Sequence, residues 1–128
     1  MKIYYREKSG GIEILRCFGI EGRVEIPGMI DGKLVISAAP YAFSSHMDEK
    51  EELKNASLWE VSEGLGFGRE EHVLAGNDVE EIVFPYTLKE IGRYIFYGCG
   101  NLKKLEFSDS LMQIGCGAFT GCHALEKL

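Results

Sequence analysis

The sequence predicts one α/β solenoid domain, in which short strands and helical turns coil around a shared core. The first observation is a repeat with a period of 23 residues, because residues 79–101 and 102–124 carry matching residues at fixed offsets and a further copy begins over 125–128. The matched positions are Ile82 and Leu105, Phe84 and Phe107, Leu88 and Leu111, Ile91 and Ile114, Phe96 and Phe119, and Cys99 and Cys122. A unit this short cannot bury its apolar side alone, so successive units stack.

Composition is the second observation, and it indicates one globular domain. The chain has 128 residues, of which 45% are hydrophobic and 27% charged, and its formal net charge is -6. That charge argues against a nucleic-acid partner, which needs clustered Lys and Arg. No stretch approaches the roughly 18 apolar residues of a membrane span. Because residues 1–8 are charged where a signal peptide is apolar, we expect a cytoplasmic protein as written, and a surface or secreted one if a leader was removed.

The N-terminal part, residues 1–22, is expected to cap the array. Residues 3–8 and 12–18 are joined by Ser9-Gly10-Gly11. Paired glycines provide the positive φ angles of a tight turn, so this segment predicts a β-hairpin.

Each repeat is expected to contain two strands and one helical turn. In the repeat 102–124, alternation sends Leu105 and Phe107 to one face of a strand and Lys104 and Glu106 to the other. After a turn, a second short extended run follows, and Gly115 permits the next bend. The segment from there to Cys122 is too short for more than one helical turn.

The middle of the chain departs from the plain repeat. Residues 23–44 form an elongated first repeat, and 45–78 form an insertion. The insertion opens with Ser45-His46-Met47-Asp48, a helix capping box, so we expect a helix running to about Ser62. The remainder, up to Asp78, is expected to be mainly loop.

The repeats resemble a known family. Residues 102–122 read Leu-x-x-Leu-x-Phe and then Leu-x-x-Ile-Gly-x-x-Ala-Phe-x-Gly-Cys, and related motifs occur at 24–27, 30–35 and 41–43. This pattern resembles the BspA-like (Treponema pallidum type) leucine-rich repeats of bacterial proteins. The resemblance implies a right-handed leucine-rich-repeat array, and adhesion or host-surface binding for exported members.

The outward-facing residues of the strands are the candidate partner-binding site, and they are Glu81, Val83, Lys104, Glu106 and Lys127. Equivalent residues on adjacent strands lie about 4.8 Å apart, which would place Glu81 beside Lys104. The alternative is structural, because a cross-strand ion pair between these two is worth a few tenths of a kcal/mol when exposed.

We expect no cofactor, metal or catalytic group. The glycines of residues 64–68 suggest a phosphate loop, but no strand precedes them and no helix follows. Cys116, Cys122 and His123 lack the spacing of a zinc site, and buried free thiols are the expected state of the cysteines. The segment ending at His72 has an acid beside a base but no recognisable nucleophile.

The sequence therefore favours a non-catalytic protein-protein interaction module or scaffold. A self-assembling structural protein is the alternative, because the array reaches Leu125–Leu128 without a polar cap, and its exposed edge invites pairing with another copy. An enzyme that uses the insertion 45–78 is a third hypothesis.

Overall fold

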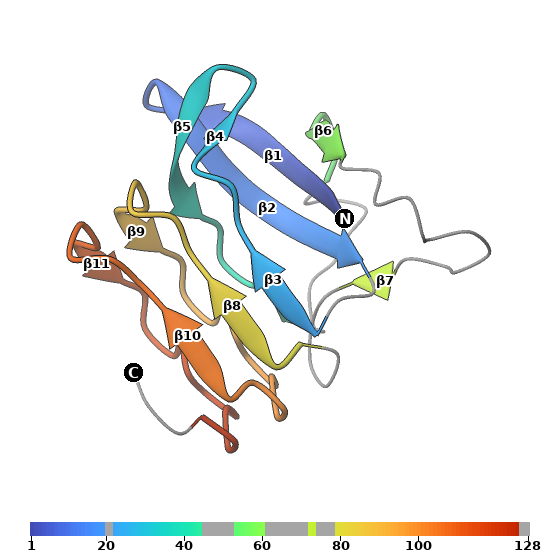
Figure 1. The fold of residues 1–128 in the computed structure, drawn as a ribbon, viewed down its shortest axis with the longest axis vertical. Helices are drawn as coiled ribbons and strands as arrows, with labels where there is room; N and C mark the ends of the chain where they lie inside the picture. Colours follow the sequence, from blue (N-terminus) through green and yellow to red (C-terminus); the bar gives the residue numbers. More distant parts are fainter. Residues whose placement is uncertain (20–21, 45–52, 61–71, 74–78, 126–128) are drawn as a thin grey trace.

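The fold is a stack of flattened, solenoid-like coils whose short strands line two facing β-sheets (Figure 1). The computed structural model describes residues 1–19, 22–44, 53–60, 72–73 and 79–125. The strands are β1 (Lys2–Lys8), β2 (Gly11–Gly19), β3 (Arg23–Glu25), β4 (Met29–Ile30), β5 (Lys33–Ala38), β6 (Ser57–Glu60), β7 (His72–Val73), β8 (Glu81–Val83), β9 (Glu90–Ile91), β10 (Lys104–Glu106) and β11 (Gln113–Ile114).

Strand pairing follows the sequence repeat. The smaller sheet has the order β10-β8-β3, and the larger has the order β11-β9-β5-β2-β1-β6, with β4 added to β5 and β7 added to β2. Lys104 lies opposite Glu81 and Gln113 opposite Glu90, both in parallel pairs. Each of these pairs is separated by 23 residues in the chain, so the predicted period sets the register of β8 with β10 and of β9 with β11.

The N-terminal hairpin forms, but it is not the last element of its sheet. Strands β1 and β2 pair antiparallel around Ser9 and Gly10, which both have positive φ. Strand β6 then pairs with the other side of β1, where Trp59 lies opposite Ile3. The hairpin is therefore internal to the larger sheet, which corrects the expectation of a terminal cap.

The described residues contain no helix, so the α part of the expected fold class is wrong. The expected helical turn of each repeat is a pair of hydrogen-bonded turns, in which the Tyr97 N–H donates to the Tyr94 carbonyl three residues earlier (3.1 Å). Alternate N–H groups donate to the next rung instead, from Tyr94 to Cys116 (3.1 Å) and from Phe96 to Ala118 (3.2 Å). A donor used between rungs cannot also close the ladder of an α-helix.

The helix expected over 45–62 is also wrong where the structure describes that range. Residues 53–55 form a turn and the following residues form β6, whereas the rest of the range lies outside the described residues. Trp59, which lies within the expected helix, packs instead from a strand and is partly buried against the core. Pairing with β1 and core packing here override a helical pattern that was only local.

Side chains at matching repeat positions share one core. The Phe96 ring lies 6.0 Å from that of Phe43 and 5.8 Å from that of Phe119, measured between centroids. Phe84 and Phe107 are stacked in the same way, 5.4 Å apart and nearly parallel. The predicted single interior of stacked aromatic residues is therefore confirmed.

Two glycines allow the rungs to touch through their backbones. A Cβ atom on Gly92 would lie 2.3 Å from the Pro40 nitrogen, and one on Gly115 would lie 2.3 Å from the Arg93 nitrogen. Real Cβ contacts are never this short, so these positions require glycine because of close approach. The structure thus gives Gly115 a packing role in addition to the bend expected after it.

A charged network connects the hairpin to the second rung. The buried Glu13 carboxylate accepts hydrogen bonds from Arg6 (2.7 Å), Lys8 (3.2 Å) and the Ser37 hydroxyl (3.2 Å). Lys8 also donates to Glu90 (2.7 Å). This last bond is the largest cause of a raised Lys8 pKa and a lowered Glu90 pKa.

Candidate interaction surface

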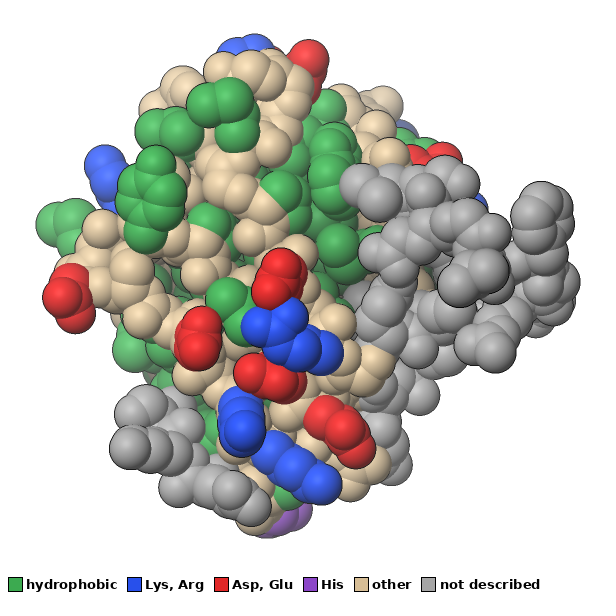
Figure 2. Space-filling model, in the orientation of Figure 1, with side chains coloured by type: hydrophobic (Ala, Val, Ile, Leu, Met, Phe, Trp, Pro, Cys, Tyr) green, Lys and Arg blue, Asp and Glu red, His purple; other side chains and the backbone are tan. Residues whose placement is uncertain are grey.

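The outer face of the smaller sheet carries a regular set of polar side chains. In each of its three strands the central residue is buried, namely Val24, Ile82 and Leu105, because the alternation of a strand sends it into the core. The flanking residues point outward and form what we call the ladder face: Arg23, Glu25, Glu81, Val83, Lys104 and Glu106. Figure 2 shows acidic and basic side chains mixed over these strands.

Four of the five predicted partner-binding residues lie on the ladder face. Lys104 is directly opposite Glu81, and Glu106 is directly opposite Val83, as the repeat predicts. The fifth, Lys127, lies outside the described residues. The structure thus brings the four together on adjacent strands, and their role in binding a partner stays a prediction.

The predicted ion pair forms with the other neighbouring strand. Among the described residues, the Glu81 carboxylate pairs with the Arg23 Nε (3.3 Å) and not with Lys104. Arg23 also holds Glu25 through its Nη1 (2.5 Å), and this hydrogen bond is the main cause of a raised Arg23 pKa. A guanidinium presents several donors in a planar fork, so one Arg can bind both carboxylates.

Sequence reasoning missed the contribution of β3. Arg23-Val24-Glu25 shows the same alternation of an exposed, a buried and an exposed residue as 81–83. This alternation was the available signal, because the elongated first repeat was already expected to begin at Arg23.

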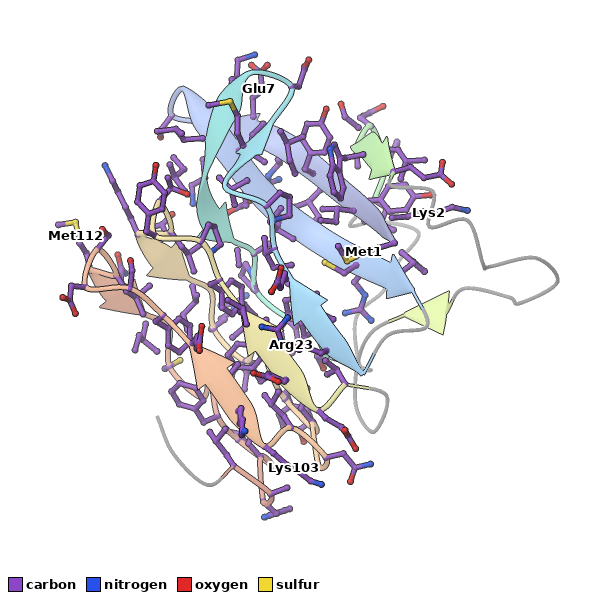
Figure 3. The ribbon with its side chains drawn as sticks, viewed as in Figure 1. Met1, Lys2, Glu7, Arg23, Lys103 and Met112 are labelled. Carbon is purple, nitrogen blue, oxygen red and sulfur yellow. The ribbon has the colours of Figure 1, made fainter. Side chains whose placement is uncertain are left out.

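A shallow depression of about 250 Å³ lies at the edge of the ladder face, and it is lined by Gly22, Arg23, Glu80, Glu81, Lys103 and Lys104. The same backbone hydrogen bonds occur among its lining residues on successive rungs. The N–H groups of Glu80 and Glu81 donate to the Gly22 carbonyl (2.7 and 3.1 Å), and those of Lys103 and Lys104 donate to the Glu80 carbonyl (2.7 and 3.2 Å). Figure 3 labels Arg23 on β3 and Lys103 just before β10.

The exposed charges of this face contribute little to the stability of the fold. Exposed ion pairs contribute about 0–1 kcal/mol to folding, and Lys104 forms no ion pair with any residue that the structure describes. At protein interfaces in general, exposed charges of this kind steer an approaching partner and set the register of contact.

The cysteines of the repeat serve packing. Cys99 and Cys122 occupy the same rung position, and each thiol donates to a phenylalanine carbonyl of the preceding rung, at Phe43 (3.2 Å) and Phe96 (3.4 Å) respectively. Burial raises the Cys122 pKa. Cys116 is exposed, which corrects the expectation that all the cysteines are buried.

The other sequence candidates bring no site together among the described residues. No group of three or more His, Cys, Asp or Glu side chains there could hold a metal ion. The glycine string 64–68 and residues 69–71 lie outside the described part, and His72 is in β7, which pairs with β2. Over the same described part, no helix has the length and apolarity to cross a membrane.

The C-terminal repeats match a known protein family. Residues 70–128 match the family described as "BspA type Leucine rich repeat region (6 copies)". A comparison with curated protein sequences finds no match. The resemblance inferred from the repeat motifs is therefore confirmed over the C-terminal part of the chain.

Two solved structures have a similar fold. One is a Treponema pallidum leucine-rich-repeat protein (TpLRR), with a TM-score of 0.67 and 25% identity over 94% of this chain and 44% of that chain. The other is a leucine-rich cell surface protein from Faecalibacterium prausnitzii, with a TM-score of 0.66 and 19% identity over 98% of this chain and 28% of that chain. The chain thus spans less than half the length of either protein.

Proposed function

Since residues 70–128 match the BspA-type leucine-rich repeat region, we propose that the chain is a non-catalytic protein-protein interaction module that binds its partner through the ladder face. The observation that carries this proposal is the parallel register of β3, β8 and β10, which aligns exposed charges over a buried apolar layer. Lys127 belongs to the proposed site because it is one repeat after Lys104.

Geometry supports a protein partner over a small molecule. The ladder face is open, its depression is shallow, and five of the six residues that line the depression are charged. Small-molecule sites are deep and enclose most of the ligand, whereas an open polar surface of mixed charge is typical of the rim of a protein interface. The expected partner therefore presents complementary acidic and basic groups.

Affinity capture with charge-reversed variants tests this proposal. Purified wild-type chain and a Lys104→Glu variant would be used to capture proteins from cells of the source organism, with the exposed Lys54→Glu as a matched control outside the ladder face. Captured proteins would then be re-tested in purified form. We expect Lys104→Glu to reduce capture of a specific protein and Lys54→Glu to leave it unchanged. Equal capture by wild type and Lys104→Glu would contradict the proposed surface.

Self-association through the C-terminal end of the described array is the second candidate function. Ile91 is 2% exposed because the next rung covers it, whereas the equivalent Ile114 is 50% exposed. The Ile91 carbonyl accepts from the Gly115 N–H (2.9 Å), and the Ile114 carbonyl has no such donor among the described residues. Exposed apolar groups and unpaired strand atoms together favour pairing with another chain.

Sedimentation velocity over a concentration series checks this second candidate. Self-association predicts larger species at tens of micromolar and their loss in Ile114→Glu, while Leu58→Glu, an exposed position on β6, should behave as wild type. A strict monomer throughout the series would rule out this mode of assembly.

A further inference from the structure

A second cluster of exposed side chains lies away from the ladder face, along the turns that follow its strands. Four large apolar side chains are exposed there: Met29 (57%), Leu34 (46%), Tyr86 (73%) and Met112 (82%). We call these four the rim patch. Scattered exposed apolar residues are normal on a protein, whereas several that gather along one edge can mark an interaction site.

Backbone and side-chain contacts hold the first two turns of the rim patch together. Met29 and Leu34 are cross-strand neighbours in the β4–β5 hairpin. Thr87 binds that hairpin through its hydroxyl, which donates to the Val35 carbonyl (2.7 Å). Tyr86 precedes Thr87 in the chain, so it lies beside the hairpin.

The turn of the next repeat, which contains Ser108, is held against the second turn by similar hydrogen bonds. The Ser108 hydroxyl donates to the Tyr86 carbonyl (3.0 Å), and the Met112 N–H donates to the Lys89 carbonyl (2.7 Å). Figure 2 shows hydrophobic side chains along this edge, and Figure 3 labels Met112 at its end. The patch therefore runs across three successive rungs.

The size of the rim patch favours a short segment as its occupant. If each of the four side chains has a full area of roughly 200 Å², their exposed fractions leave about 500 Å² available. A stable dimer buries about 800 Å² on each partner. Met and Tyr are enriched where proteins bind varied apolar segments, because Met is flexible and Tyr is amphipathic.

The charged residues near the rim patch indicate which kind of peptide segment it would bind. Lys89 lies between Tyr86 and Met112 in the chain, is exposed, and forms no ion pair with any described residue. The exposed Asp31 and Asp109 sit in the outer two turns. They would repel the many negative charges of an anionic membrane surface, and also a peptide with several acidic residues, but Lys89 between them can still pair with a single carboxylate. We propose that the rim patch binds an apolar peptide segment of a partner protein, whose carboxylate pairs with Lys89.

Peptide selection on the whole chain tests this proposal. A phage-displayed library of random peptides of about 12 residues would be panned on the purified protein, and selected peptides would be synthesised for calorimetry. We expect them to combine apolar side chains with an acidic one. Tyr86→Ser and Met112→Ser should each weaken binding about tenfold, and Lys89→Glu should weaken the acidic peptides. Leu58→Ser, which also replaces an exposed apolar residue, should not change binding.

All these positions are exposed, so the variants should fold. Failure to select any peptide, or selected peptides whose affinity the rim variants leave unchanged, would overturn the proposal. Peptides lost on Lys104→Glu instead would support the ladder face and overturn the rim patch. Binding of phosphatidylserine vesicles that depends on Tyr86 and Met112, without peptide binding, would show that the patch meets a membrane.

Discussion

Replacing Phe96 with Ala should destabilise the protein far more than the same change at Phe119. The two residues occupy the same repeat position, one rung apart. Phe96 is fully buried, and its ring lies 5.8–6.1 Å from those of Phe43, Phe84 and Phe119. Phe119 is only partly buried.

The expected magnitudes follow from this difference. Truncating a buried Phe to Ala costs about 3–5 kcal/mol. The three aromatic pairs of Phe96 place it at the upper end of this range, so Phe96→Ala should lose about 5 kcal/mol. Phe119→Ala loses one stacking contact and less buried area, and should cost about 2 kcal/mol. A domain has only about 5–15 kcal/mol of stability, so Phe96→Ala should be close to unfolding.

Urea unfolding followed by circular dichroism measures both losses by linear extrapolation. If Phe96→Ala does not fold, Phe96→Leu and Phe119→Leu provide a milder pair, with the same order expected. Equal losses at the two positions, or a larger loss at Phe119, would refute the conclusion that the rungs share one core that ends beyond Phe119 in the described array.

Three further predictions concern close packing, charge and thiol access. Gly92→Ala should lower the free energy of unfolding in urea by about 3 kcal/mol, because its Cβ would meet the backbone of Ala39 and Pro40 in the neighbouring rung. Gly28→Ala should change stability little, because its Cβ would lie 3.6 Å from the nearest atom. The lowered Glu90 pKa means that its bond to Lys8 stabilises the fold above the unfolded pKa of about 4.5 and is lost as pH falls through the folded value. The urea midpoint of Glu90→Gln should therefore lie below wild type between about pH 5 and 8, and the two should converge in acid; a constant gap would contradict this. Cys116 should react with a thiol reagent in the native protein while Cys99 reacts only on unfolding, and mass spectrometry of labelled peptides would detect the reverse.

Most of what could be predicted about the fold follows from the 23-residue period of the repeat. The offset of 23 residues places Lys104 opposite Glu81 and Phe119 on Phe96, and both placements are observed. The helical turn was wrong because the length of a segment does not reveal where its N–H groups donate. At Tyr94 and Phe96 they donate to the next rung, which no local pattern records.

The candidate site shows the same division. Alternation along each strand identified Glu81, Val83, Lys104 and Glu106 as outward-facing, because a strand has only two faces. The ion-pair partner of Glu81 could not be read in this way. Two basic residues lie directly opposite it, Arg23 on β3 and Lys104 on β10, and only the folded structure shows that Arg23 binds it.

By itself the sequence determined which residues repeat, which of them point inward, and which rungs are neighbours, because these follow from period and alternation along the chain. Only the tertiary structure decided that 57–60 is a strand against β1, that Gly92 and Gly115 are needed for backbone contact, and that the turns expose the rim patch. These features depend on atoms far apart in the chain that meet only after folding, so their energies have no counterpart in a local pattern.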